Sequence, residues 1–305
     1  MIKGRGLTFG VIGAGSMGQN HLRIAAELSG LKLIGLFDKD PSLANDVASK
    51  YGVSSFSDCH ELLAKVDAVS IVTPTKTHLT IASDVLSNNK HVLLEKPFTG
   101  RSSDAEVLSR LANEKGVVLN VGFIERFNPA FIKLQKLVKG EKIIGVDIKR
   151  FSPFPSRISD TDVIFDMMIH DLDLLNVLIP FEIEEVRAEG NKVKSRFLDR
   201  VSSTIVYKSG VIARVSGDRT AEDRTRKISV TTEKQVVEAD LLNKVIYLRD
   251  FSSPIPSTTP VPPVDQLTSE LTAFLGSIKG IKRPGNDALA AIRAIKLAEE
   301  VKNAC

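Results

Sequence analysis

Three polar residues stand at helical spacing in the stretch FDMMIHDLDLL. Asp166, His170 and Asp173 follow an i, i+4, i+7 pattern, so on a helix they lie along one face. Their neighbours are apolar, so these polar groups are expected to be partly buried and to need partners. Asp166 could orient His170 and fix its tautomer, and an imidazole titrates in the range needed to take a proton from an alcohol. The alternatives are a satisfied core histidine with capping carboxylates, or metal ligation, for which no third ligand with recognised spacing is evident.

A lysine that could take part in catalysis lies in the stretch VLLEKPF. Glu95, Lys96 and Pro97 follow a predicted parallel strand, at the edge where open α/β sheets bind ligands. A lysine is usually a solvated charge, and whether the Lys96–Pro97 bond is cis is left open. Oxidation of an alcohol by nicotinamide needs a base for the hydroxyl proton and positive charge near the developing alkoxide. His170 and Lys96 fit these roles, although a Lys96 with a pKa depressed by burial could itself accept the proton.

Three closely spaced glycines follow an apolar strand pattern and precede a helix pattern. Gly13 permits a tight turn, Gly15 lets the backbone approach a pyrophosphate, and Gly18 allows close helix–strand packing. The helix N-terminus offers amides to the phosphates. The second predicted strand ends at Asp38, which can accept bonds from a ribose hydroxyl and repel a 2′-phosphate. This favours NAD over NADP, whereas Lys39 could pair with a phosphate, and Asp38 could simply begin a turn.

Composition restricts the class of protein. The chain has 305 residues, 43% hydrophobic content and a formal net charge of +4, with no basic block that would indicate nucleic acid. Cys59 and Cys305 lack metal-type spacing and favour a reducing compartment. Neither a signal peptide nor a membrane span is expected. The sequence therefore predicts a soluble, cytoplasmic protein without a membrane or nucleic-acid partner.

Strand and helix patterns alternate over about the first 120 residues and then change. Apolar strands separated by single helices predict a doubly wound parallel sheet of the Rossmann type. Later stretches alternate with period two and predict an open, mainly antiparallel sheet. The proline-rich stretch SSPIPSTTPVPPVD is expected to be a loop. The expected domains are residues 1–123 for NAD, residues 124–284 for substrate and oligomer contacts, and a C-terminal helix over 285–305 packing back on the first domain.

Four motifs occur in a recognisable order: GVIGAGSMG, VTPTKTH, EKPF and DMMIHDLDLL. In this order and spacing they resemble the Gfo/Idh/MocA oxidoreductase family over nearly the whole chain. The resemblance implies a Rossmann domain for NAD(P) and an open sheet that carries the substrate side and often the oligomer contact. It places the motif lysine, aspartate and histidine on Lys96, Asp166 and His170. The residues expected on the cofactor side are Gly13, Ala14, Gly15, Ser16, Met17, Gly18, Asp38, Thr73, Pro74, His78, Glu95 and Lys96.

Two further stretches, VGFIERFNPAF and FSPFPSRISDTDVIFDMMIHDLDLL, resemble a narrower branch. That branch oxidises UDP-N-acetylglucosamine at the 3-hydroxyl to a keto sugar nucleotide. Arg126, Asn128 and Arg157 then become candidates for holding the sugar or its diphosphate, since the arginine fork donates two parallel bonds. The alternative for each is a surface salt bridge, for Arg126 with Glu125. The expected substrate-side residues are Lys96, Arg126, Asn128, Arg157, Asp166, His170 and Asp173.

The resulting hypothesis is an NAD-dependent dehydrogenase acting on a CH–OH group of a nucleotide sugar. A dehydrogenase of a free sugar or an inositol-type polyol is the alternative among enzymes. A non-catalytic NAD-binding redox sensor is the alternative from another class, although a sensor needs neither Lys96 nor the Asp166/His170 pair. A homo-oligomer, dimer or tetramer, is expected because open antiparallel sheets often pair.

Overall fold

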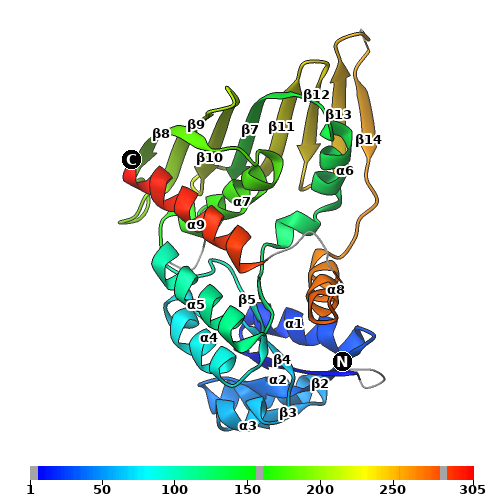
Figure 1. Cartoon of the computed structure of the whole chain (residues 1–305), viewed down its shortest axis with the longest axis vertical. Helices are drawn as coiled ribbons and strands as arrows, with labels where there is room; N and C mark the ends of the chain where they lie inside the picture. Colours follow the sequence, from blue (N-terminus) through cyan, green and yellow to red (C-terminus); the bar gives the residue numbers. More distant parts are fainter. Residues whose placement is uncertain (1–5, 156–160, 254, 282–286) are drawn as a thin grey trace. The chain divides into compact units, whose positions relative to one another are not determined.

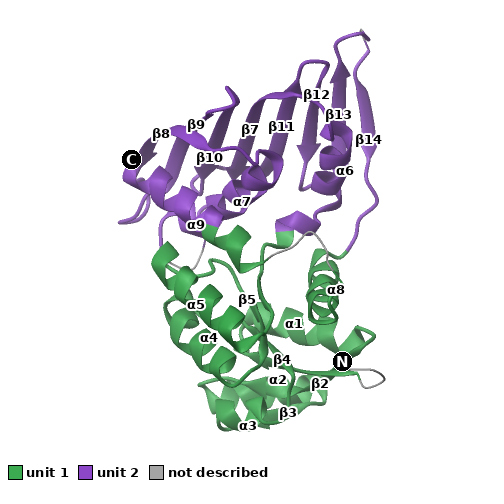
Figure 2. Cartoon of the chain, in the orientation of Figure 1, with its two compact units in different colours: residues 1–124, 265–292 green, residues 125–264, 293–305 purple. Residues whose placement is uncertain are grey.

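The computed structural model describes residues 6–155, 161–253, 255–281 and 287–305. The chain divides into two compact units, shown in different colours in Figure 2. The first unit holds residues 1–124 and 265–292, and the second holds residues 125–264 and 293–305. The chain therefore contributes two separate segments to each unit.

The first unit is built on a parallel sheet of six strands in the order β3-β2-β1-β4-β5-β6. The strand order reverses between β1 and β4, which is where open α/β sheets bind their ligands. This confirms the predicted doubly wound sheet. Its strands are β1 (Leu7–Ile12), β2 (Leu31–Phe37), β3 (Ser54–Phe56), β4 (Ala68–Ile71), β5 (His91–Leu94) and β6 (Leu119–Val121).

Helices follow the strands of the first unit in alternation (Figure 1). The clearest local signals are at α2, where the side chain of Asp40 caps the first turn and Gly52 ends the helix at φ 63°. Among the described helices, none is long and apolar enough to cross a membrane. The helical segments are α1 (Ser16–Glu27), α2 (Pro41–Tyr51), α3 (Cys59–Leu63), the short turn η1 (Thr75–Thr77), α4 (His78–Ser87) and α5 (Ser102–Lys115).

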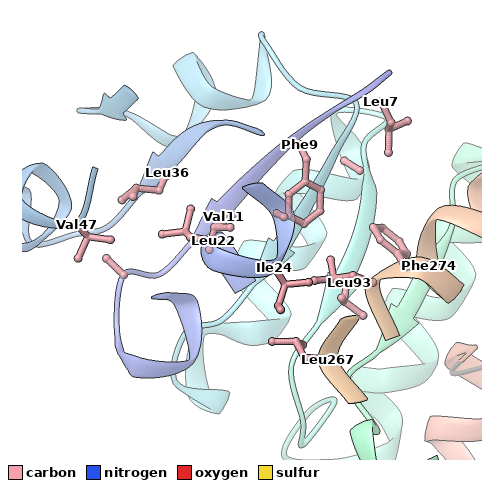
Figure 3. Close-up of a cluster of buried hydrophobic side chains, with 14 of the residues drawn as sticks. Leu7, Phe9, Val11, Leu22, Ile24, Leu36, Val47, Leu93, Leu267 and Phe274 are labelled. Atoms are coloured by element: carbon pink, nitrogen blue, oxygen red, sulfur yellow. The ribbon is translucent and has the colours of Figure 1, made fainter. Parts of the chain in front are cut away.

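Helix α8 (Gln266–Ile278) belongs to the first unit, although the sequence places residues 124–284 in the second domain. Its apolar face joins the core formed by α1, α2 and the sheet (Figure 3). Leu267 and Phe274 lie in the same buried cluster as Phe9 and Ile24. The domain boundary differs from the predicted one because the unit to which α8 belongs depends on the surface that its apolar face packs against. A helical pattern in the sequence does not identify that surface.

The second unit is built on an open sheet of eight strands in the order β14-β13-β12-β11-β7-β10-β9-β8. Strands β7 and β10 run parallel and every other neighbouring pair is antiparallel, as expected for a mainly antiparallel sheet. The strands are β7 (Ile143–Phe151), β8 (Ile183–Asn191), β9 (Arg200–Tyr207), β10 (Ile212–Asp218), β11 (Thr225–Thr232), β12 (Gln235–Asp240), β13 (Val245–Asp250) and β14 (Ser257–Pro260).

Strand β14 corrects one expectation, because it lies inside the proline-rich stretch expected to be a loop. All four of its residues are exposed and it pairs only with β13 among the strands of its sheet. Proline is tolerated in an edge strand because one side of the strand makes no ladder bonds. The edge position, which the sequence does not reveal, thus explains the difference.

The helices of the second unit cover one face of the sheet (Figure 1). Turn η2 (Ile124–Phe127) leads from the first unit to α6 (Pro129–Val138), which contacts β11, β12 and β13. The apolar segment around His170 begins as a π-helical turn, η3 (Ile164–Met168), and continues as α7 (Ile169–Leu178). A side chain at Gly217 of β10 would collide with Met168, so this glycine lets η3 approach the sheet closely.

For the last helix, α9 (Ala288–Asn303), the sequence predicts packing back on the first domain. Only its start, up to Ile292, is assigned to the first unit, and residues 293–305 belong to the second. Lys302 there pairs with the buried Asp162 at 2.8 Å and lies over the ring of Phe165. Contrary to the prediction, the end of α9 therefore packs within the second unit, because its charged and aromatic partners lie there.

Candidate active site

The glycine loop connects β1 to α1, and the structure shows a separate reason why each of its three positions is occupied by glycine. Gly13 has φ 107°, and a Cβ there would lie 2.4 Å from the carbonyl oxygen of Val72. A Cβ on Gly18 would lie 2.0 Å from the carbonyl oxygen of Gly13. These two glycines are required by the protein's own backbone, as the turn and close-packing arguments predict.

Gly15 differs because a Cβ there would meet no protein atom within 4 Å. Its backbone is extended, so the fold alone does not demand glycine at this position. Gly15, Ser16 and Met17 are exposed, and the N-cap position of α1 carries no capping side chain. The exposed amides of this turn are available to an anionic ligand, which fits a dinucleotide pyrophosphate.

Asp38 is tied to this loop. Its carboxylate accepts a hydrogen bond of 2.7 Å from the backbone amide of Ala14 and another of 2.9 Å from the amide of Asp40. A carboxylate has about four acceptor positions, so Asp38 retains capacity for a ribose hydroxyl. The end of β2 is therefore fixed beside the glycine loop in the arrangement that a dinucleotide needs.

A second loop of the first unit is held by His78. The ring of His78 is buried, with Nε2 at 2.8 Å from the carbonyl oxygen of Thr73 and Nδ1 at 2.9 Å from that of Pro97. The hydroxyl of Thr77 donates to the carbonyl oxygen of Pro74 at 2.7 Å. Of the residues expected near the cofactor here, His78 connects two loops, whereas Pro74 is exposed and Thr73 is half-buried.

Lys96 follows β5, as the sequence predicts, and its bond to Pro97 is cis. The lysine is half-buried, and its backbone amide donates to Oε2 of Glu95 at 3.1 Å. The other oxygen of Glu95 lies 3.1 Å from Nε2 of His21. Burial alone would raise the pKa of Glu95, but the hydrogen bond and charge of His21, together with Lys96, hold it below its ordinary value.

His21 is a residue that the sequence reasoning missed. It lies on α1, three positions after Gly18, among the apolar residues that face the core. Its Nδ1 lies 2.9 Å from the hydroxyl oxygen of Ser70, which is itself fully buried on β4. A polar side chain on the buried face of an amphipathic helix is the signal that could have identified it.

In the second unit the predicted Asp166, His170 and Asp173 come from two types of helix. Asp166 lies in the π-helical turn, whereas His170 and Asp173 lie in α7. His170 and Asp173 are buried, and the exposed fraction of the Asp166 side chain is 31%. The π turn changes the register between Asp166 and the residues that follow, and such turns are frequent at functional sites.

Each of the two aspartates pairs with an arginine. Asp173 accepts two hydrogen bonds of 2.6 Å from Nε and Nη2 of Arg126. Asp166 lies 3.5 Å from Nη1 of Arg219, a fully buried arginine that also pairs with Asp199 at 2.9 Å. Hydrogen bonds from three backbone amides and Ser195 hold the pKa of Asp199 well below its ordinary value, although burial opposes this.

A buried ionic network surrounds Glu125, next to this site. The same oxygen of Glu125 accepts hydrogen bonds from Arg150 at 3.0 Å and from Arg226 at 3.1 Å. Arg150 also makes a bidentate pair with Asp171, the residue after His170. Burial would raise the pKa of Glu125, but the positive charges of Arg150, His170 and Arg226 lower it to about 2. Burial raises the pKa of Asp171 against the influence of Arg150.

The network was missed at the sequence level because its members are distant along the chain. The sequence offers Glu125 as a salt-bridge partner of its neighbour Arg126, whereas in the structure Arg126 pairs with Asp173 and Glu125 with Arg150. Asn128 is fully buried and caps α6, its Oδ1 accepting from the amide of Ala130 and its Nδ2 donating to Glu125 and to the carbonyl oxygen of Leu241. Arg157, the remaining candidate, lies outside the described residues.

No group of three or more histidine, cysteine, aspartate or glutamate side chains is placed to hold a metal ion in the part of the chain that the structure describes. The clustered polar groups are instead paired with arginines and backbone amides. They are suited to holding charged side chains in fixed positions around a polar ligand.

Comparison with known proteins agrees with this geometry. The model of the Gfo/Idh/MocA oxidoreductase family with an NAD-binding Rossmann fold matches residues 7–123. The model of the Gfo/Idh/MocA C-terminal domain matches residues 150–238. The chain belongs to the Gfo/Idh/MocA oxidoreductase family. It is an oxidoreductase acting on CH–OH groups, and its first unit is an NAD-binding Rossmann domain.

Individual relatives span most of the chain. UDP-N-acetylglucosamine 3-dehydrogenase from Acidithiobacillus ferrooxidans is 32% identical over 96% of this chain and 95% of its own length. A solved structure of that enzyme superposes with a TM-score of 0.92 and covers 98% of both chains. The NAD(+)-dependent scyllo-inositol 2-dehydrogenase from Bacillus subtilis is 30% identical over 69% of this chain and 67% of its own length.

Proposed function

We propose that this protein oxidises the 3-hydroxyl of UDP-N-acetylglucosamine, or of a closely related nucleotide sugar, to a ketone. The observation that carries the proposal is the similarity to a UDP-N-acetylglucosamine 3-dehydrogenase over 96% of the chain in sequence and 98% in structure. The inositol dehydrogenases among the relatives match a smaller part of the chain or match it with lower identity. They make an inositol or free sugar the second candidate substrate.

The residues proposed to hold NAD are those of the glycine loop and its surroundings. The loop from Gly13 to Gly18 would take the pyrophosphate on its amides, and Asp38 would accept from a ribose hydroxyl. The loop held by His78 would lie along the nicotinamide half, with Thr73 and Pro74. When bound, NAD supplies the acceptor for the hydride, so the alcohol carbon loses two electrons and becomes a carbonyl carbon.

Lys96 and His170 are the proposed acid–base residues. One of them accepts the hydroxyl proton, while a positive charge on Lys96 stabilises the oxygen as the alkoxide develops. Asp166, itself beside Arg219, is proposed to orient His170. In the second unit, Asp173 fixes the plane of the Arg126 guanidinium, which is proposed to contact the sugar nucleotide, as is Arg157.

Substrate choice is tested with the purified protein, NAD and a carbonyl trap that removes the ketone. The panel contains UDP-N-acetylglucosamine, UDP-glucose, UDP-N-acetylglucosaminuronic acid, glucose and myo-inositol, and NADH formation is measured. Turnover confined to UDP-N-acetylglucosamine supports the proposal. Turnover confined to glucose or inositol rejects the nucleotide-sugar site and keeps the family's chemistry.

The preference for NAD over NADP is proposed to depend on Asp38. Asp38→Asn removes the negative charge and retains a side-chain acceptor for the amide of Ala14. We expect the ratio of kcat/KM for NADP to that for NAD to rise about tenfold, equivalent to about 1.4 kcal/mol. An unchanged ratio would contradict the role of Asp38, and Asp58→Asn, at the cap of α3, serves as the control.

We also propose a homo-oligomer and a cytoplasmic location. The homo-oligomer is proposed from the open sheet. The helices of the second unit lie against one face of this sheet, and alternate strand residues such as Lys149, Arg214 and Ser229 face away from the core, on the side proposed to pair. Both cysteines are free thiols, which suits a reducing compartment. Light scattering of the purified protein and fractionation of cells test these two points.

A further inference from the structure

His21, Glu95 and Ser70 form a buried hydrogen-bonded group inside the NAD-binding unit. The three residues come from α1, the end of β5 and β4, respectively. His21 and Ser70 are fully buried, and the exposed fraction of the Glu95 side chain is 14%. Both ring nitrogens of His21 are engaged, at 2.9 Å by Ser70 and at 3.1 Å by Glu95.

The Glu95 carboxylate is confined on its other sides as well. Its Oε2 accepts the backbone amide of Lys96 at 3.1 Å. A Cβ added to Gly122, just after β6, would lie 3.2 Å from the carboxyl carbon of Glu95, so the glycine makes room for this group. The carboxylate is therefore held between His21 on one side and the start of the Lys96–Pro97 segment on the other.

Packing alone does not account for such a group. The other inward-facing residues of α1 include Leu22, Ile24 and Ala25, and apolar side chains fill this interior at lower cost than a buried imidazole and carboxylate. The polar group is placed where β5 ends and the proposed proton-handling residue begins. It also connects α1, whose N-terminus forms the glycine loop, to that same point.

We propose that His21 is a positioning residue for the oxidation: by donating from Nε2 to Glu95 it fixes the carboxylate that holds the backbone of Lys96. The inference rests on the proposed role of Lys96. His21 does not touch the reacting atoms and acts only through Glu95. Ser70 holds the His21 ring in the orientation that presents Nε2 to Glu95.

The arrangement has an electrostatic consequence. The ionisable groups that act on Glu95 are His21 and Lys96, and they lower a pKa that burial by itself would raise. Without His21, the pKa of Glu95 rises and the carboxylate takes up a proton at a higher pH. Protonated Glu95 is a weaker acceptor for the amide of Lys96, so activity on the acid side is lost at a higher pH.

Two substitutions at one position separate this role from simple packing. The amide of His21→Gln extends as far as Nε2 and keeps a donor for Glu95, whereas the shorter His21→Asn reaches only the Nδ1 position and loses it. His60→Asn, at an exposed histidine of α3, is the matched control. Steady-state kinetics, NAD binding by fluorescence quenching and thermal unfolding are measured for each variant.

We expect His21→Asn to lower kcat roughly 10- to 100-fold with little change in NAD affinity, because a small displacement of a catalytic group is costly. The acid limb of its kcat/KM profile should move to higher pH. His21→Gln should recover most of both losses. Equal kinetics for the Asn and Gln variants, or an unmoved acid limb in His21→Asn, would overturn the inference.

Lys96→Ala distinguishes this inference from the proposed function. If Lys96→Ala retains full turnover, the proposed role of Lys96 fails, whatever His21 does. If Lys96→Ala is inactive while His21→Asn behaves as the wild type, only the positioning role of His21 fails.

Discussion

The two units hold their functional groups by different physical means. In the first unit the candidate cofactor loop is made of backbone, with Gly13 and Gly18 so closely packed that neither could carry a Cβ. In the second unit the surroundings of His170 are made of paired charges, with Glu125, Arg150 and Asp171 buried together. The first depends on the absence of side chains, and the second depends on every partner being present.

The difference determines how each site should respond to substitution. In the glycine loop, a side chain at Gly13 or Gly18 would collide with backbone and disturb folding, whereas one at Gly15 meets no protein atom and should disturb only binding. A buried ion pair is costly to break because the remaining charge is left without compensation in a medium of low polarity. Activity and stability should therefore separate at Gly15 in the first unit and fall together in the ionic network of the second.

Replacement of Lys96 by alanine should have the largest effect on activity. We expect kcat to fall by about 100- to 10,000-fold, the range that positioned acid–base groups contribute, with thermal stability little changed. The rate of NADH formation at steady state, with both NAD and the sugar nucleotide present, measures this. Lys65→Ala, at an exposed lysine of the same unit, should retain wild-type turnover.

Arg150→Leu should be the most destabilising of the changes in the second unit. It leaves Glu125 and Asp171 buried without their shared cation, and we expect a loss of about 3–5 kcal/mol in the free energy of unfolding. Urea denaturation measures the loss. Arg187→Leu removes an arginine whose pair with Glu185 is fully exposed, so its effect on stability should be far smaller than that of Arg150→Leu. Similar losses for the two arginines would show that the buried network is no more costly to break than an exposed pair.

The stabilising effect of Glu125 should depend on pH. Because its pKa in the folded protein, about 2, is below the ordinary 4.5, its contribution is fully present above about pH 4.5 and is lost as the pH falls toward 2. The contribution at neutral pH is about 3 kcal/mol. The stability difference between wild type and Glu125→Gln should therefore shrink as the pH falls from 7 to about 3. Glu182→Gln, at an exposed glutamate, should show no comparable pH dependence.

The smallest expected effect is at Gly15. Gly15→Ala adds a Cβ that meets no protein atom, so we expect unfolding within about 0.5 kcal/mol of the wild type. NAD affinity should nevertheless fall about tenfold, since the added methyl occupies the side from which the pyrophosphate approaches. Equilibrium binding of NAD measures this. Unchanged affinity would show that the ligand does not approach the loop at Gly15.

The sequence by itself determined the features that depend on neighbouring residues. The glycine loop, the alternation that predicts the parallel sheet, and the cap of α2 by Asp40 are each set within a few positions of the chain. The placement of Lys96 just after a strand likewise follows from the apolar run directly before it. Helical spacing likewise identified the polar segment around His170, although it did not reveal the π turn at Asp166.

Only the tertiary structure decided which distant residues become partners. His21 and Glu95 are 74 positions apart, and Glu125 and Arg150 are 25 apart, so no local pattern relates them. Helix α8 joined the first unit for the same reason, because its apolar face is complementary to a surface formed far away in the chain. Periodicity shows that a side chain is directed inward, but the identity of its partner depends on how the elements pack.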